Sequence, residues 1–408
     1  MSKPVTPSFA DRMRQLRAER GLSIRALAKL TFHAKTYIHE LETGRKQPTP
    51  QVAQRIDDAL DAGGVLTMLA ASQPDGVRRR DLVAAAGFAA VLPHTLLVSG
   101  RKVGADVPQQ LLDRTARLRR IDDYLGGIDT YPMYATEVES TMRLVREGSY
   151  TEATGRSLLS VLAEQAQMAG WAAFDGGRQD DADRLYRLSL DAARDSADEA
   201  LAANAFAFLA YGATGRTATE TAAAACDAAG TSATPRVRLL LHTRAAWAYA
   251  VSGHAADAAA HLGIGAAALA DDDERPEPDW VYWVDQVELE IMTGRCWTVL
   301  HRPVRAIPAL ERALSAYEDT HGRDKALYLL WLADAYLDAN EIEHACVAVR
   351  KAMKLAAGVG SVRPGGRLQA VFDRLDPHAA LPCVADLKQE AREWGRRRRT
   401  VATTSGKP

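Results

Sequence analysis

The sequence predicts an all-α protein, in which a small helical domain at the N-terminus is followed by an array of helical hairpins. Three observations support this class. Alanine is very abundant, and long β-branched runs between turn signals are scarce, which favours helices over strands. Apolar residues recur at helical spacing in residues 9–60. Residues 111–390 contain hairpin-like units in which small residues recur at similar places.

A chain of 408 residues is long enough for two or more domains. Residues 1–70 are predicted to form the N-terminal domain, 71–110 a linker with one packing helix, 111–392 the helical array and 393–408 a basic, disordered tail. Within the linker, residues 78–93 (RRRDLVAAAGFAAVLP) resemble a twin-arginine export signal. Such signals are N-terminal, so an exported, cleaved repeat protein is kept only as an alternative.

The N-terminal domain begins with a helix after Ser8, because Phe9, Met13 and Leu16 lie on one helical face. Ser23 stands where an N-cap belongs, so a second helix is predicted to follow it. In the stretch LSIRALAKL, apolar residues recur three positions apart, so they are expected to lie on one buried face of this second helix.

Residues 31–33 break the helical pattern, and another helix is predicted over residues 34–43. Gly44 ends it as the glycine that follows many helices. Its outward face carries side chains that can hydrogen-bond base edges or phosphates, namely Lys35, Thr36 and His39. Arg45 and Lys46 follow directly, where a loop could hold a DNA phosphate.

A helix, a turn, a second helix and a basic loop form the layout that places one helix in the major groove of DNA. A further helix follows with Pro50 at its first position, and Val52, Ile56 and Leu60 on one face. The predicted DNA-contacting residues are Ser23, Arg25, Lys35, Thr36, Tyr37, His39, Arg45 and Lys46.

This pattern resembles the Cro-type (XRE family), lambda-repressor-like helix-turn-helix family. The residues that carry the resemblance are Leu16-Arg17, Gly21-Leu22-Ser23, Leu27-Ala28, Tyr37-Ile38, Leu41-Glu42, Gly44 and Arg45. The resemblance implies that the first turn of the second motif helix reads bases. One departure is Phe32-His33, where the family has Gly followed by an aliphatic residue; a bulky residue with positive φ is costly, so a reshaped turn is expected.

Charge is unevenly distributed along the chain. Residues 1–80 contain 14 Lys and Arg against 8 Asp and Glu, whereas the remainder contains 37 against 44. The formal net charge of −1 therefore combines a basic N-terminal part with an acidic remainder. Attraction to DNA is electrostatic, so the imbalance supports DNA binding by the N-terminal domain.

The four cysteines are scattered, without a CxxC and without a nearby histidine pair. They are predicted to be thiols of a reducing cytosol, neither a disulfide framework nor a zinc site. No apolar run reaches the roughly 18 residues that span a bilayer. Motifs of nucleotide-binding, zinc-protease and serine-hydrolase sites are absent, so neither an enzyme nor a cofactor or metal site is predicted. Residues 321–324 (HGRD) are expected in a loop without a catalytic role.

The clearest hairpin unit is residues 326–357, in which Asn340 turns the chain between two helices. This unit resembles a tetratricopeptide repeat, where small residues let helices cross closely. Further copies are predicted at 163–194, 200–229, 239–270 and 281–315. Their anchor residues are 37 to 45 residues apart, so the repeat is degenerate, and a plain α-helical array is the alternative. Either version is an α-solenoid.

A solenoid of this kind presents its first helices on a concave face. Aromatic and amide side chains at the positions that line the groove of tetratricopeptide repeats would suit an extended peptide. The candidate ligand-binding residues are Gln167, Trp171, Phe174, Asn204, Phe208, Tyr211, Thr243, Trp247, Tyr282 and Asp285. Asn204 is the most suggestive, because a buried amide within AANAFAFLAY needs a partner. Taken singly, each aromatic residue is more typical of the core than of a ligand contact.

The whole chain resembles two groups of regulators with tetratricopeptide-like repeats: the peptide-pheromone receptors of Gram-positive bacteria, and long actinobacterial regulators to which residues 123–140 and 157–178 are similar. The resemblance implies a cytoplasmic, dimeric transcriptional regulator that binds a double-stranded DNA operator and responds to a peptide, small-molecule or protein signal. A scaffold that binds proteins through its repeats and has lost DNA binding is the alternative.

Overall fold

The structure is a computed structural model. It describes residues 9–404 except for 32, 47, 49, 72–101, 123, 124, 231, 232, 272, 318–321 and 357–359. The described part is helical and holds no β-strand, only an isolated bridge between Lys102 and Ser149, which confirms the predicted fold class. None of the described helices is long and apolar enough to cross a membrane. The predicted linker helix in residues 78–93 lies outside the described residues.

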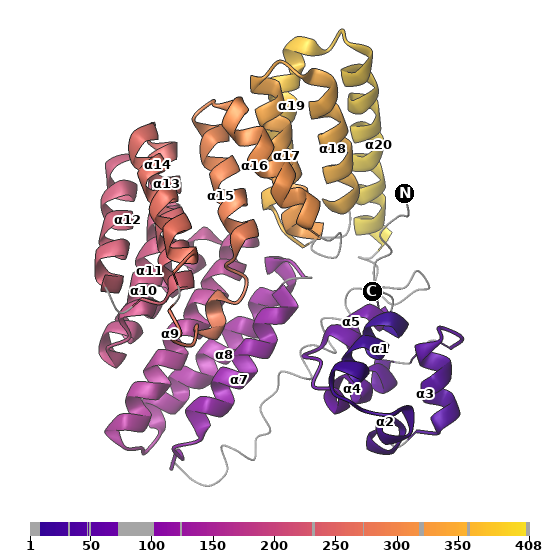
Figure 1. Cartoon of the computed structure of the whole chain (residues 1–408), viewed down its shortest axis with the longest axis vertical. Coiled ribbons are helices and arrows are strands. Elements are labelled where there is room, and N and C mark those ends of the chain that lie inside the picture. The colour runs from indigo at the N-terminus through magenta and orange to yellow at the C-terminus, as the bar shows by residue number, and fades with distance from the viewer. Residues whose placement is uncertain are drawn as a thin grey trace.

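Short helices form the N-terminal domain, which we call the head (residues 9–71; Figure 1). They are α1 (Phe9–Glu19), α2 (Ile24–Leu30), α3 (Lys35–Glu42), α4 (Pro50–Ala59) and α5 (Val65–Ala71). Their apolar faces meet in one core, as the spacing predicted. Its buried members include Phe9, Met13, Leu27, Ile38, Leu41, Ile56 and Leu60. Burial of each large apolar side chain contributes about 1.5–3 kcal/mol, so this core fixes the packing of α3.

The two motif helices have the caps that the sequence predicts. Ser23 is the N-cap of α2, and its hydroxyl accepts a hydrogen bond of 3.1 Å from the backbone N–H of Ala26. Gly44 follows α3 with a φ of +69°, the left-handed conformation that favours glycine after a helix. In the turn between them, the N–H of His33 donates to the carbonyl of Ala28 at 2.9 Å. Phe32, on which the expected reshaping rests, lies outside the described residues.

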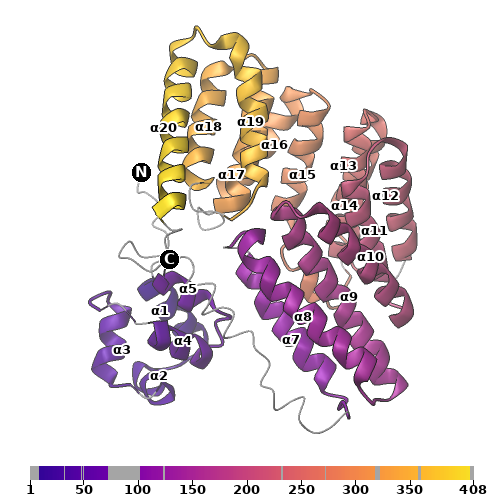
Figure 2. The same ribbon diagram turned by 180° about the vertical axis from the view of Figure 1, so that it is seen from behind.

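Helical hairpins follow one another in an arc, which we call the array (residues 107–404; Figures 1 and 2). The pairs are α7 (Val107–Asp122) with α8 (Gly127–Glu147), α9 (Glu152–Asp175) with α10 (Gln179–Ser196), α11 (Glu199–Gly212) with α12 (Gly215–Ala229), α13 (Pro235–Val251) with α14 (Ala255–Leu269), α15 (Gln286–Val299) with α16 (Pro303–Ala316), α17 (Gly322–Asp338) with α18 (Ile342–Ala356), and α19 (Arg363–Leu375) with α20 (Pro382–Thr404). Each predicted repeat copy coincides with one of these pairs. Asn340 turns the chain between α17 and α18 with a φ of +61°.

Two expectations about the ends of elements are wrong. Residues 393–404, predicted to belong to a disordered tail, continue α20, because arginine is a good helix former and the run of four arginines does not interrupt the helix. The stretch GRD at residues 322–324, expected in a loop, forms the first turn of α17, and its arginine is buried. The array also begins at Val107, four residues before the predicted boundary.

The array closes on itself, because the ends of its first helices contact the start of α17 and the segment before α19. The N–H of Ile128 donates to the carbonyl of Gly360 at 2.9 Å, and the N–H of Val362 donates to the carbonyl of Asp175 at 3.0 Å. We call this region the closure contact, and define it as residues 122, 125–128 and 175 on one side and residues 323 and 360–363 on the other.

Asp175 is the centre of the closure contact and is fully buried. One carboxylate oxygen accepts from the N–H of Gly127 at 2.8 Å, and the other accepts from the hydroxyl of Ser361 at 2.8 Å. The guanidinium groups of Arg323 and Arg363 lie 3.9 and 3.6 Å from the same carboxylate. A buried charge is tolerated only when it is paired and hydrogen-bonded in this way, so Asp175 joins four segments of the chain.

Candidate DNA-contacting helix and interior cavity

The outward face of α3 carries the predicted base-reading side chains. Lys35, Thr36 and His39 are exposed, and Arg45 and Lys46 are exposed in the loop that follows. In both views α3 lies at the edge of the head that faces away from the array (Figures 1 and 2). The face is therefore free, within the described part of the chain, to enter a groove of DNA.

The other predicted DNA-contacting residues differ in their surroundings. Ser23 and Arg25 are exposed at the start of α2, and Tyr37 is half-buried. Lys46 forms an ion pair of 2.8 Å with Glu40 and lies 5.5 Å from the centre of the Tyr37 ring. The hydrogen bond to Glu40 raises the pKa of Lys46. A DNA phosphate would therefore compete with Glu40 for the Lys46 ammonium group.

A partly buried ion pair anchors α3 against α1. Arg17 contacts Glu42 through two parallel bonds, of 2.5 Å from Nε and 3.1 Å from Nη2, the bidentate geometry that fixes orientation. The remaining Nη1 of Arg17 donates to the carbonyl of Leu22 at 2.7 Å. This arrangement holds the C-terminal end of α3 while its N-terminal turn stays exposed.

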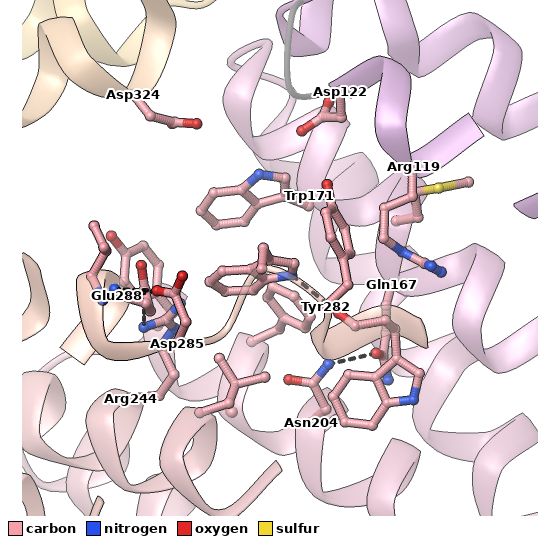
Figure 3. A pocket seen from close by; sticks show the side chains of 18 of the residues that line it. Arg119, Asp122, Gln167, Trp171, Asn204, Arg244, Tyr282, Asp285, Glu288 and Asp324 are labelled. Atoms are coloured by element: carbon pink, nitrogen blue, oxygen red, sulfur yellow. Dashed lines mark hydrogen bonds and ion pairs between the residues drawn. The ribbon is translucent and has the colours of Figure 1, made fainter. Parts of the chain in front are cut away.

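An interior cavity of about 460 Å³ lies on the concave side of the array. Its wall comes mainly from the first helices of successive hairpins, α7, α9, α11, α13, α15 and α17, together with the start of α19. The connection between α14 and α15 contributes Trp280, Tyr282 and Trp283, of which Tyr282 is labelled in Figure 3. A volume of this size is typical of sites for small ligands.

Seven of the ten predicted ligand-binding residues line the cavity, namely Gln167, Trp171, Asn204, Phe208, Tyr211, Tyr282 and Asp285. The other three do not. Thr243 is buried between helices, where its hydroxyl donates to the carbonyl of Leu240 at 2.8 Å. Trp247 packs against Tyr211 and Trp331, and Phe174 packs on Trp171. Phe174 and Trp247 thus share a helix face with residues that line the cavity but lie about one turn farther along α9 and α13.

Asn204 has the partner that its burial requires. Its amide nitrogen donates to the Oε1 of Gln167 at 2.7 Å, and the Nε2 of Gln167 donates to the Ser189 hydroxyl and the Leu201 carbonyl at 3.0 and 2.8 Å. Gln167 therefore uses its amide to orient Asn204. The oxygen of Asn204 points away from this bond (Figure 3), so it is the atom of the pair that can contact a ligand.

Buried ion pairs form the part of the wall that the sequence did not predict. Arg119 contacts Glu164 and Asp279, which ties α7 to α9 and to the connection before α15. Arg244 contacts Glu288 at 2.8 Å. A further pair joins Asp122 to Arg323 at 2.9 Å, within the closure contact.

These surroundings change the pKa of two cavity residues. Burial raises the pKa of Asp122 to about 6, although Arg323 opposes the shift. Burial would also raise the pKa of Tyr211, but the charges of Arg295 and Arg363 outweigh it and lower that pKa to about 8. Perturbed groups gathered in one cavity are typical of functional sites.

Arg295 is the cation of the cavity that lacks a carboxylate partner among the described residues. It is 5% exposed, and its guanidinium donates to the Tyr211 hydroxyl at 2.6 Å and to the sulfur of Met292 at 3.3 Å. Its centre lies 4.4 Å from the Trp247 ring, whose π-face partly compensates the charge. Its Nε has no hydrogen-bond partner in the described structure.

The fold and the two sites define a class of protein: a helix-turn-helix domain joined to a closed array of helical hairpins with an interior cavity. Residues 8–69 match a family model described as a helix-turn-helix domain, so the head belongs to that type of domain. No curated protein matches the chain.

One solved structure shares similarity across most of the chain. The crystal structure of Bacillus thuringiensis PlcR in complex with the peptide PapR7 and DNA is 12% identical in sequence, with a TM-score of 0.29. The match covers 92% of this chain and 97% of that chain. A similarity at this TM-score bears on neither the fold nor the function of this protein, which follow from its own elements.

Proposed function

We propose that this protein is a DNA-binding transcriptional regulator of the Cro type whose array binds a small effector in the interior cavity. One observation carries the proposal: a helix-turn-helix domain with an exposed basic reading face shares a chain with a cavity of about 460 Å³ that holds a buried arginine whose Nε has no hydrogen-bond partner in the described structure. The helix-turn-helix domain supports sequence-specific DNA binding. The cavity supports the binding of a ligand that fills it and pairs with the buried arginine.

The wall indicates the chemistry of the effector. Trp171, Phe208 and Tyr282 offer flat apolar surfaces, which suit an aromatic or otherwise planar body. Arg295 has unused hydrogen-bonding capacity and no carboxylate partner among the described residues, so a carboxylate or similar anion on the ligand would form a charge-assisted bond there. The effector that fits best is a compact aromatic acid, and the carboxyl end of a short peptide offers the same chemistry.

The contact between head and array supports the idea that ligand binding in the cavity affects the DNA-binding domain. Gly64, in the turn before α5, lies beside Ile121 of α7, because a side chain added at Gly64 would lie 3.9 Å from the Ile121 Cγ1. The next residue, Asp122, lines the cavity and pairs with Arg323. A ligand that alters this pair would therefore act one residue away from the surface on which the head rests.

We further propose a cytoplasmic homodimer that binds two operator half-sites. A single small helix-turn-helix domain buries too little surface for tight specific binding, and paired domains match symmetric operators. The cavity is proposed to bind rather than to catalyse, since most of its charged side chains are engaged in ion pairs with one another. A scaffold that binds partners through the array without binding DNA is the second candidate.

Genomic footprinting tests the DNA-binding part of the proposal. The purified full-length protein is expected to protect a small set of sites that share a symmetric sequence, at fixed salt, and low-molecular-mass cell extract should change their occupancy. Affinity should also fall steeply as salt rises. Protection indistinguishable from that of random duplex would favour the scaffold and contradict the proposal.

Thermal shift tests the effector chemistry. Indole-3-acetate is expected to raise the melting temperature more than indole-3-acetamide, because only the acid can pair with Arg295. This difference should vanish in Arg295→Gln. Asn204→Ala should weaken binding of both probes while leaving basal DNA binding intact. If acid and amide stabilise the protein equally, the assignment of an anionic ligand is wrong; if only a peptide with a free carboxyl end stabilises it, the peptide is the effector.

A further inference from the structure

Three consecutive helices of the array, α12, α13 and α14, bring one cysteine and two histidines together. Cys226 lies on α12, His242 on α13 and His261 on α14. The Sγ of Cys226 is 3.9 Å from the Nδ1 of His242, and this Nδ1 is 2.9 Å from the Nδ1 of His261. The three possible ligand atoms all lie within 4.8 Å of one another. The fold therefore gathers a cysteine and two histidines that are not neighbours in the sequence.

We propose that Cys226, His242 and His261 form a site for a divalent metal ion of the zinc class. In a tetrahedral zinc site, bond lengths of about 2.05 Å to nitrogen and about 2.3 Å to sulfur place two nitrogens about 3.3 Å apart, and sulfur about 3.6 Å from nitrogen. Two of the three observed separations, 2.9 and 3.9 Å, differ from these values by a few tenths of an ångström, and all three ligand atoms lie within 4.8 Å of one another. Side-chain rotations that bring Cys226 and His261 closer together would create the site.

The donor set selects the metal. One thiolate with two imidazoles suits Zn²⁺ and Co²⁺, whereas Mg²⁺ and Ca²⁺ prefer oxygen ligands. All three side chains are half-buried, so an ion has access from solvent and a water molecule can complete a fourth position. A site with three protein ligands and one open position is the arrangement that zinc adopts outside closed structural sites.

Neighbouring side chains orient the ligands. The Tyr249 ring stacks on His261 with 5.2 Å between centroids and 19° between planes, which limits rotation of that imidazole. Asp257 lies one turn before His261 on α14, and its charge acts on that histidine. The charge of Arg238, one turn before His242, is offset by its ion pair with Asp271.

Without a metal, the two imidazoles share one proton at 2.9 Å, so one Nδ1 donates and the other accepts. Burial lowers the pKa of His242 to about 4 and also lowers that of His261, so both rings are neutral near pH 7, the form that ligates metals. Burial raises the pKa of the Cys226 thiol to about 12. A bound ion must therefore displace this proton, which passes to solvent, and the proton shared by the imidazoles moves to the outer nitrogen of its ring.

The site joins helices that also build the cavity. Leu240 and Arg244, which flank His242 on α13, line the cavity wall. On a helix, residues two apart point to nearly opposite faces, so the metal would lie on the far side of α13 from the effector. A metal that binds only the folded state stabilises it, and here it would hold α12, α13 and α14 together.

Cobalt spectroscopy on the purified full-length protein tests the site. One equivalent of Co²⁺, added to reduced and metal-free protein without oxygen, is expected to give a thiolate-to-cobalt charge-transfer band and the intense visible bands of tetrahedral Co²⁺. Zn²⁺ should abolish both by displacement. Cys226→Ser should lose the charge-transfer band, and His242→Ala and His261→Ala should each weaken binding at least tenfold. Circular dichroism confirms that each variant is folded.

Matched controls use a cysteine and a histidine outside the cluster. Cys383→Ser and His254→Ala should leave the spectrum unchanged. In the wild-type protein, Zn²⁺ should also slow alkylation of Cys226 at least tenfold by peptide mass spectrometry, while Cys383 is unaffected. The proposal would be overturned if one equivalent of Co²⁺ gave no charge-transfer band, or if the band remained in Cys226→Ser. It would also be overturned if Zn²⁺ did not change the rate at which Cys226 is alkylated.

Discussion

Asp122 of α7 and Arg323 of α17 form an ion pair of 2.9 Å although they are 201 residues apart in the chain. Arg323 also contacts Asp324 at 3.0 Å and donates to the carbonyl of Leu125 at 3.3 Å. One guanidinium therefore connects the first hairpin of the array to its sixth. Because Asp122 and Arg323 also line the cavity, closure of the array and the shape of the cavity depend on the same pair.

Removal of the Arg323 side chain is expected to destabilise the array strongly. Arg323→Ala would leave Asp122 without its cation and Asp175 with Arg363 alone, and breaking a buried pair in this way costs about 3–5 kcal/mol. The free energy of unfolding, measured with urea, should fall by that order. Arg184→Ala, which removes a largely exposed arginine that forms an ion pair with Asp181, should change it by no more than about 1 kcal/mol. Equal losses in the two variants would argue against the closure contact.

The pH dependence of stability should reveal the raised pKa of Asp122. Its pKa of about 6 in the folded state exceeds the ordinary value of 3.8, so the folded protein holds this proton more tightly than the unfolded chain. Asp122 therefore contributes most to the free energy of unfolding below about pH 4, and this contribution is lost as the pH rises to 6. At about 1.36 kcal/mol per pKa unit, the loss is on the order of 2–3 kcal/mol.

Urea unfolding of wild type and Asp122→Asn between pH 4 and 7 measures this contribution. The variant should gain stability relative to wild type as pH rises, because it has no carboxyl group to titrate. Asp191→Asn, at an exposed position of α10, should follow the wild-type curve. A constant difference between Asp122→Asn and wild type across this range would refute the raised pKa.

Local patterns predicted the fold well, because each helix carries its own evidence. Small residues and turn residues such as Asn340 placed the hairpins, and the N-cap at Ser23 placed α2. The prediction was less accurate where a local sequence feature favoured a structure other than the one that forms. Tyr282 was assigned to the first helix of a repeat, but it lies in the connection before α15. The run of arginines in residues 396–399 suggested disorder, yet charge alone does not end a helix.

Only some residues of the candidate site could be predicted from the sequence. Asn204 and Tyr211 could be found because they lie on the inner face of one helix at helical spacing. Arg119 and Arg323 could not, because their partners are 160 and 201 residues away and a charged residue in a helix normally indicates a solvated face. The cluster of Cys226, His242 and His261 could not be predicted either, because its members are far apart in the sequence and lie on three different helices.

Gly126 should be intolerant of any side chain. A Cβ at this position would overlap the carbonyl group of Gly360 across the closure contact, and backbone atoms cannot move aside as a flexible side chain can. Gly126→Ala is therefore expected to lose about 1–3 kcal/mol and to expand the array in small-angle X-ray scattering. Gly365→Ala, where a Cβ meets nothing within 4 Å, should be neutral or slightly stabilising. A compact, fully stable Gly126→Ala would contradict the described closure.

Specific DNA binding should depend on the exposed face of α3. Lys35→Ala and His39→Ala are each expected to weaken operator affinity by roughly 1–3 kcal/mol in a mobility-shift assay at fixed salt, the usual range for a base contact. Binding to random duplex should change much less. Arg20→Ala removes one positive charge from the same domain at a distance from α3, where its guanidinium donates to the carbonyl of Asp61 at 2.8 Å. If this control weakens operator binding as much as Lys35→Ala and His39→Ala do, the basic charge of the head, and not the groove-facing surface of α3, accounts for the affinity.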